Sequence, residues 1–87
     1  MINSKSNPVE WAALLYELED AKEHLESLIT QMNSDGAIDE ESEYKIHIGH
    51  IYAHINRGWN SRNKIGEQTE DERNLFSSFP NDIESCG

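Results

Sequence analysis

Apolar residues between Pro8 and Met32 recur at alternating spacings of three and four residues. This period places them on one stripe of an α-helix, while the acidic residues of the segment fall outside the stripe. The pattern predicts a helix over residues 8–32 that packs its stripe against a neighbouring helix. The members of the stripe are Trp11, Leu14, Leu15, Leu18, Ala21, Leu25, Leu28, Ile29 and Met32.

Signals at both ends of this segment support the helix. Asn7 and Glu10 have the spacing of a capping box, and Pro8 suits the first helical position, where its missing N–H is not needed. The turn-forming run that ends in Gly36 predicts the end of the helix, because glycine readily takes a positive φ. The polar residues 1–6 before the helix are expected to be loose.

A second helix is predicted over residues 39–62, with Asp39 as its cap and acidic residues in its first turns. The short connection over residues 33–38 implies that this helix folds back antiparallel to the first one. Gly49 is interpreted as a packing position and Gly58 as a sign of fraying. The apolar stripe of this second helix consists of Tyr44, Ile48, Ile51, Tyr52, Ile55 and Trp59.

The last third of the chain predicts a linker over residues 63–68, a short helix over residues 69–79 and a tail over residues 80–87. Thr69 and Glu72 have capping-box spacing, and Pro80 is expected to end the helix. We expect the apolar residues of this region to lie on the hairpin. They are Leu75, Phe76, Phe79 and Ile83.

The length and composition point to one small all-α domain that is short of core. The chain has 87 residues, of which 36% are hydrophobic, and a chain of this size buries a limited share of its surface. Two helical stripes cover each other only in part. We therefore expect two hairpins to associate as a homodimer that forms a four-helix bundle. The residues expected in this core and dimer stripe are Trp11, Leu14, Leu18, Leu25, Leu28, Ile48, Ile51 and Ile55.

The charge balance restricts the classes of partner. Seventeen acidic residues against seven basic ones give a formal net charge of −10, which argues against binding to nucleic acid or to an anionic membrane. No apolar run has the length of a membrane span, and no signal peptide is recognisable. Cys86 is the only cysteine, so a disulfide within one chain is impossible, and a cytoplasmic location is expected.

One histidine cluster could carry chemistry. His47, His50 and His54 share one side of the second helix, and the four-residue spacing of His50 and His54 can chelate a metal. Imidazole suits zinc, nickel or copper. No cofactor is expected apart from zinc or nickel at this cluster. His24 and Glu17 flank the stripe of the first helix in a comparable way. The alternative is that these are interface histidines hydrogen-bonded to acidic residues.

A second cluster lies at the end of the second helix. Tryptophan and arginine are enriched where proteins bind their partners, so this end is a candidate recognition surface. The alternative is that the tryptophan belongs to the core and that the polar residues cap the helix. The residues concerned are Arg57, Trp59, Asn60 and Arg62.

The chain contains no recognisable nucleophile motif, phosphate loop or zinc-type cysteine pair, so an enzyme is not expected. Three functions remain open. The first is a non-enzymatic interaction or adaptor protein with an unknown protein partner, and the second is a metal-binding protein that uses the histidines. The third is an acidic inhibitor of a basic toxin or nuclease, whose binding would be sensitive to salt.

Overall fold

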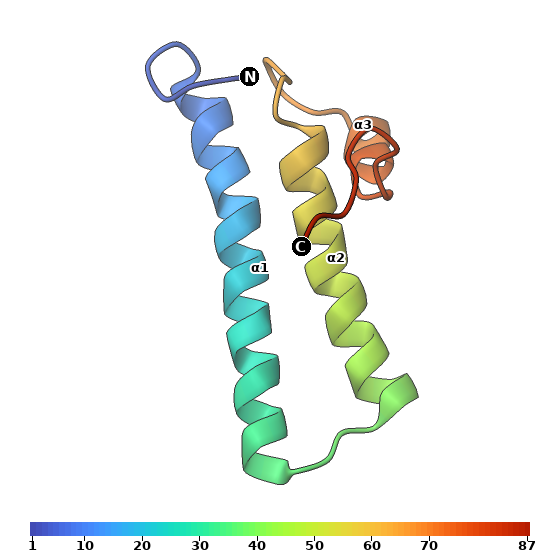
Figure 1. Cartoon of the computed structure of the whole chain (residues 1–87). Coiled ribbons are helices and arrows are strands. Elements are labelled where there is room, and N and C mark those ends of the chain that lie inside the picture. Colours follow the sequence, from blue (N-terminus) through green and yellow to red (C-terminus); the bar gives the residue numbers. More distant parts are fainter.

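The structure is a computed structural model that describes all 87 residues and contains helices without any strand. Helix α1 spans Pro8–Asp35, a π-helical turn η1 spans Glu40–Tyr44, α2 spans Lys45–Asn60 and α3 spans Glu70–Phe76. Helices α1 and α2 lie side by side and antiparallel, and α3 packs against the outer side of α2 near the N-terminal end of α1 (Figure 1). The predicted all-α hairpin with a short C-terminal helix is confirmed.

Helix α1 continues three residues beyond its predicted end. Gly36 then takes a φ of 69° and donates its N–H to the carbonyl of Met32, as the glycine signal suggested. The predicted capping box at the start of α1 is wrong, because the Asn7 side chain caps no N–H group. The Glu10 carboxylate instead accepts the N–H of Gly66 at 3.0 Å and so holds the linker against α1.

The N-terminal segment is anchored rather than loose. Ile2 is only 5% exposed, and its N–H donates to the carbonyl of Arg62 at 2.9 Å. The side chain of Asn3 accepts the N–H groups of Lys5 and Ser6, which closes a turn before α1. The expectation of a loose segment failed because one isoleucine among polar residues gives no periodic signal.

The second predicted helix is divided into η1 and α2. Asp39 caps it as predicted, since its carboxylate accepts the N–H of Ser42 at 2.8 Å. The roles expected of the two glycines were wrong. A Cβ atom at Gly58 would lie 3.0 Å from Leu18 Cδ2, whereas one at Gly49 would meet nothing within 4 Å. Gly58 is therefore the position of close approach between α1 and α2.

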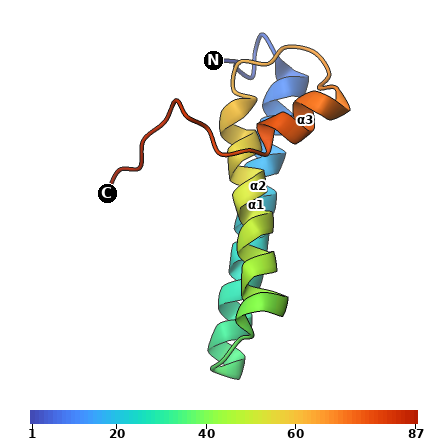
Figure 2. The same ribbon diagram turned by 90° about the vertical axis from the view of Figure 1, so that its right-hand side faces the viewer.

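Helix α3 begins with the predicted capping box between Thr69 and Glu72. It ends at Phe76, earlier than predicted. The segment after it is bonded to the hairpin as far as Asp82, and the C-terminal end then runs away from the hairpin (Figure 2). Leu75 and Phe79 remain 68% and 66% exposed, so the prediction that these side chains bury on the hairpin was wrong. Phe79 does stack on Tyr52, with ring centroids 6.0 Å apart.

The core of the hairpin is small. The only buried apolar side chains are those of Ile2, Leu14, Ala21 and Leu28, and no large side chain is fully buried. None of the helices is both long enough and apolar enough to span a bilayer. Buried polar residues are as many as the buried apolar ones, namely Glu17, His54, Asn56 and Ser61, and the largest polar network lies between α1, α2 and α3.

Candidate functional site

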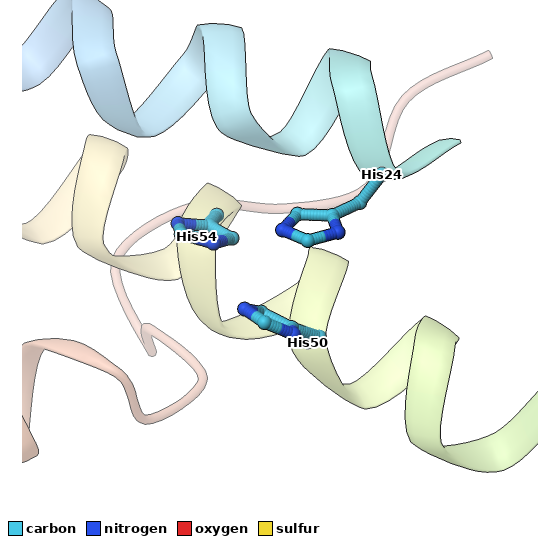
Figure 3. Close-up of side chains that lie close together, drawn as sticks. All are labelled: His24, His50 and His54. Carbon is cyan, nitrogen blue, oxygen red and sulfur yellow. The ribbon is translucent and has the colours of Figure 1, made fainter. Parts of the chain in front are cut away.

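Three imidazole rings meet on one face of the hairpin. His24 comes from α1, and His50 and His54 come from consecutive turns of α2 (Figure 3). One nitrogen of each ring lies within 4.8 Å of a nitrogen of each other ring. The ring centroids of His24 and His50 are 4.2 Å apart, and those of His50 and His54 are 4.9 Å apart. We call these three residues the histidine triad.

The members of the triad differ in burial. His54 is only 6% exposed, whereas His24 is half-buried and His50 is exposed. Burial and the positive charge that His24 and His54 can carry lower the pKa of His50 below its ordinary value. His50 therefore stays neutral at pH 7 and keeps a lone pair on its ring.

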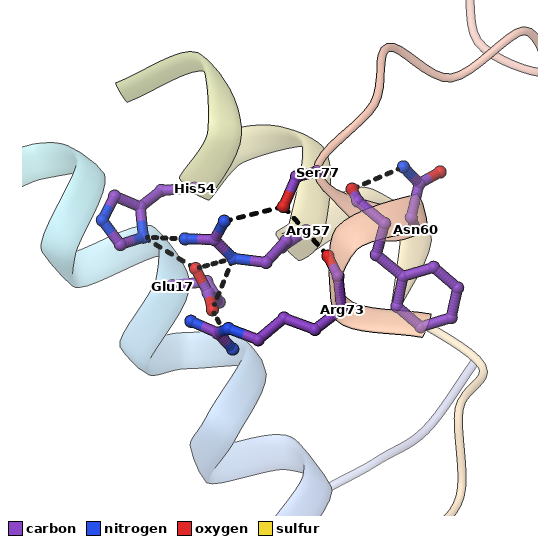
Figure 4. A network of polar contacts seen from close by, with 7 residues as sticks. Glu17, His54, Arg57, Asn60, Arg73 and Ser77 are labelled. Carbon is purple, nitrogen blue, oxygen red and sulfur yellow. Dashed lines mark hydrogen bonds and ion pairs between the residues drawn. The ribbon is translucent and has the colours of Figure 1, made fainter. Parts of the chain in front are cut away.

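A buried carboxylate fixes the ring of His54. Oε2 of Glu17 lies 2.7 Å from Nδ1 of His54, and the side chain of Glu17 is only 11% exposed. A terminal nitrogen of Arg57 also lies 3.0 Å from Nδ1, but a guanidinium group only donates and a carboxylate only accepts, so Nδ1 can serve one of the two partners. The shorter distance to Glu17 assigns a proton to Nδ1, which donates to the carboxylate. The other ring nitrogen, Nε2, points away from Glu17 (Figure 4) and is buried without a hydrogen-bond partner.

Two arginines surround the same carboxylate. Nε of Arg57 lies 3.0 Å and 3.1 Å from the two oxygens of Glu17, and a terminal nitrogen of Arg73 on α3 lies 3.4 Å from Oε1. Arg57 also donates to Oγ of Ser77 at 2.8 Å, just after α3 (Figure 4). Glu17 and Arg57 therefore join all three α-helices, and we call Glu17, His54, Arg57, Arg73 and Ser77 the Glu17 network.

The charges of this network decide the protonation state of Glu17. Burial alone would raise the pKa of Glu17, but hydrogen bonds from Arg57 and His54 and the charges of Arg57 and Arg73 outweigh it. The net result is a pKa below the ordinary value, so Glu17 is a carboxylate at neutral pH. An ionised Glu17 accepts a hydrogen bond from Nδ1 of His54 and so fixes the orientation of the ring, with Nε2 directed away from the carboxylate.

The triad is not the set of histidines that the sequence suggested. His50 and His54 are brought together as expected, but His47 lies outside the group and His24 takes its place. Glu43, which lies one helical turn before His47, accepts a hydrogen bond from Gln31. Sequence reasoning did mark His24 and Glu17 as flanking the apolar stripe. It could not pair them with His50 and His54 without the register between the two helices.

The cluster at the end of α2 binds the C-terminal segment of the same chain. The side-chain amide of Asn60 donates to the carbonyls of Phe76 and Ser78 at 2.8 Å and 3.0 Å. Trp59 donates its indole N–H to Asp82 at 2.8 Å. Asn56, which begins the same polar run of the sequence, is buried and donates to the carbonyl of Ser77 at 3.0 Å.

Arg62 completes this cluster from the end of α2. Its guanidinium group donates to the carboxylate of Asp82 at 3.0 Å and lies 3.8 Å from the centroid of the Trp59 ring. Arg57 contributes through the Glu17 network. All four candidate recognition residues therefore contact the chain itself, and each of them forms a hydrogen bond with the segment that follows α3.

The opposite face of the hairpin is apolar. On each long helix, the exposed apolar residues lie to the same side of the buried residues when the helix is viewed from its N-terminus. In an antiparallel pair of helices, the two sets therefore share one face of the hairpin. Leu14 and Leu28 of the predicted stripe are buried, and Trp11 and Ile51 are half-buried. Ala21 is also buried and Trp59 is half-buried, whereas the remaining members stay 39–50% exposed. We call these exposed residues the apolar face: Leu18, Leu25, Ile29, Met32, Tyr44, Ile48 and Ile55.

The hairpin thus offers two surfaces of different chemistry, the histidine triad with the Glu17 network on one face and the apolar face on the other. A function for this chain must use the chemistry of one or both of these surfaces. Comparison of the whole chain with protein-family models, curated proteins and solved structures gave no match.

Proposed function

We propose that the protein is a non-enzymatic interaction module that works as a homodimer, in which two hairpins pair through their apolar faces into a four-helix bundle. The observation that carries this proposal is the apolar face itself. Leu18, Leu25, Ile48 and Ile55 have the heptad-like spacing of helix-packing residues, yet they stay 39–47% exposed in one chain. Contiguous apolar surface of this kind marks an interaction site.

The exposed area of the chain supports a partner of considerable size. The accessible surface is 6502 Å², whereas a compact monomer of 10.0 kDa is expected to expose about 5,200 Å². Part of the excess of about 1,300 Å² belongs to the extended tail. The excess shows that one chain buries less surface than a compact monomer of its mass, which leaves the apolar face open to a partner.

A second copy of the chain fits this surface better than a charged partner does. The face runs along both long helices, and symmetric pairing of two hairpins would place leucines and isoleucines against their own kind. The net charge of −10 opposes association, because two copies repel each other. We therefore expect salt to strengthen the dimer by screening this repulsion, whereas salt would weaken binding to a basic partner.

The test is the mass of the protein in solution, measured by size-exclusion chromatography with light scattering at micromolar concentration. We expect about 20 kDa, twice the chain mass of 10.0 kDa. Ile55→Glu places a charge on the apolar face and should give monomers. Ile46→Glu is the matched control, since Ile46 lies nine residues earlier on the opposite side of the helix and is 62% exposed.

Circular dichroism of both variants separates loss of association from loss of folding. A helical monomer for Ile55→Glu with a dimer for Ile46→Glu would support the proposal. A parent protein that stays near 10 kDa at low and at high salt would overturn it. So would equal loss of the dimer in both variants, because the contact would then not involve the apolar face.

A further inference from the structure

The histidine triad has the parts of a metal site. Three nitrogen donors from two helices lie within 4.8 Å of one another. Around a tetrahedral zinc ion with Zn–N bonds of 2.0–2.1 Å, neighbouring ligand atoms lie about 3.3 Å apart. The donors already lie on one face of the hairpin, and rotation of side chains must close the remaining separation. No cysteine or carboxylate belongs to this group of three.

The state of His54 is a second and independent indication of a ligand. Its Nε2 atom is buried without a hydrogen-bond partner, on a side chain that is only 6% exposed. A buried polar atom without a partner costs free energy, which native proteins seldom leave uncompensated. Its Nδ1 atom donates to the carboxylate of Glu17 at 2.7 Å. Histidine ligands of metals commonly have this arrangement, in which the carboxylate orients the ring and raises its basicity.

We propose that His24, His50 and His54 bind one zinc ion per chain, with Glu17 as the residue that orients His54. Imidazole nitrogens suit zinc, and a site with three protein ligands leaves the fourth position for water. Because His50 is exposed, that position faces solvent. Zinc at this site would join α1 to α2 through the imidazoles.

Binding requires movement of two of the rings only. The three rings lie stacked or tilted against one another, with angles of 15–33° between their planes, and their lone pairs must turn to converge on one ion. His54 is held by Glu17 and serves as the fixed ligand. His24 is half-buried and His50 is exposed, so both rings can rotate about their side-chain bonds without opening the core.

This inference is independent of the proposed dimer, because the triad lies within one hairpin on the face opposite the apolar face. The stoichiometry separates the two proposals. One zinc per chain is expected whether the protein is a monomer or a dimer. One zinc per two chains would place the metal between copies and would overturn the site described above.

The experiment is calorimetric titration of zinc into untagged full-length protein with Cys86→Ser, which removes the only thiol. Competition with a chromophoric chelator gives the affinity. We expect saturable binding of one ion per chain. His24→Ala and His50→Ala should each weaken binding by more than the roughly 10–100-fold that loss of an orienting carboxylate costs. Both variants remove exposed or half-exposed side chains, so circular dichroism should show them folded.

His47→Ala is the matched control, because His47 lies on the same helix as His50 but outside the triad. Its affinity should stay close to that of the parent. Zinc at a hundredfold excess over its dissociation constant should raise the melting temperature of the parent by roughly 10–20 °C. Absence of saturable binding would overturn the proposal. Equal weakening by His47→Ala and His24→Ala would also overturn it, since the ion would then bind histidines without regard to the triad.

Discussion

Replacing Glu17 by glutamine tests whether the Glu17 network holds the three helices together. Glutamine keeps the shape of the side chain and one acceptor oxygen, but it removes the negative charge and places an NH₂ group among donors. Arg57 is 11% exposed, the same as Glu17, so its guanidinium group would lose the carboxylate while remaining largely buried. Removing one partner of a buried ion pair costs about 3–5 kcal/mol.

Two features of the structure place the expected cost at the lower end of that range. Arg73 is 56% exposed and can turn into water, and Arg57 keeps its hydrogen bond to Ser77. We therefore expect Glu17→Gln to lower the free energy of unfolding by about 3 kcal/mol. A chain of 87 residues has a total stability of about 4–13 kcal/mol. The variant should thus be severely destabilised.

The assay is urea unfolding followed by far-UV circular dichroism at one fixed protein concentration, because association would make stability depend on concentration. Glu19→Gln is the matched control, since Glu19 is exposed on the same helix and should change stability by less than about 0.5 kcal/mol. The melting temperature of Glu17→Gln should fall by roughly 10–25 °C. If both variants unfold at the same urea concentration, the Glu17 network does not stabilise the fold as described.

Further predictions concern the backbone and the tail. Gly49→Ala should raise the free energy of unfolding by about 1 kcal/mol, because the position is helical and open. Gly36→Ala should lower the free energy of unfolding by about 1–2 kcal/mol, because φ at this position is +69°. If either variant had the same urea midpoint as the parent, the prediction for that glycine would be contradicted. The hydrogen bond that Trp59 donates lowers the pKa of Asp82 below 3.8. Burial of Asp82 opposes this shift, and Arg62 adds to it. The variant Trp11→Phe leaves Trp59 as the only tryptophan. Its fluorescence spectrum should stay constant above pH 3.8 and change at lower pH, where Asp82 becomes protonated. Addition of Asp82→Ala should give the low-pH spectrum at neutral pH.

Helices whose period and caps are determined by residues close together in the sequence could be predicted from the sequence. The apolar period gave α1, and Asp39 and Thr69 marked the starts of the next helices because their side chains cap N–H groups three residues away. The capping box of Asn7 failed for a physical reason. The carboxylate of Glu10 has a competing partner in Gly66, which lies 56 residues away along the chain, and no local pattern reports that contact.

The candidate site could not be predicted from the sequence, because its residues meet through contacts between segments that are far apart along the chain. His24 joins His50 because the antiparallel register places them at the same height, and the sequence alone does not fix that register. Glu17 meets Arg57 across 40 residues. A glutamate flanking an apolar stripe is ordinarily a solvated residue, so its burial became visible only once two arginines and His54 were seen to surround it. Asn60 was predicted to recognise a partner, and in the structure it binds the backbone after α3.

The polar face with the Glu17 network and the apolar face have different roles because the core of the hairpin is small. Buried apolar packing between α1 and α2 is limited to Leu14, Ala21 and Leu28 with the contact of Leu18 on Gly58, so it restricts sliding of one helix along the other only weakly. The Glu17 network tolerates no sliding, because a shift of one turn would leave Glu17 and Arg57 buried without each other, at a cost of several kcal/mol. Polar contacts therefore fix the register of α1 against α2, and that register brings His24 to His50. The same register aligns Leu18 and Leu25 with Ile55 and Ile48, so the network on one face determines the shape of the apolar surface on the other.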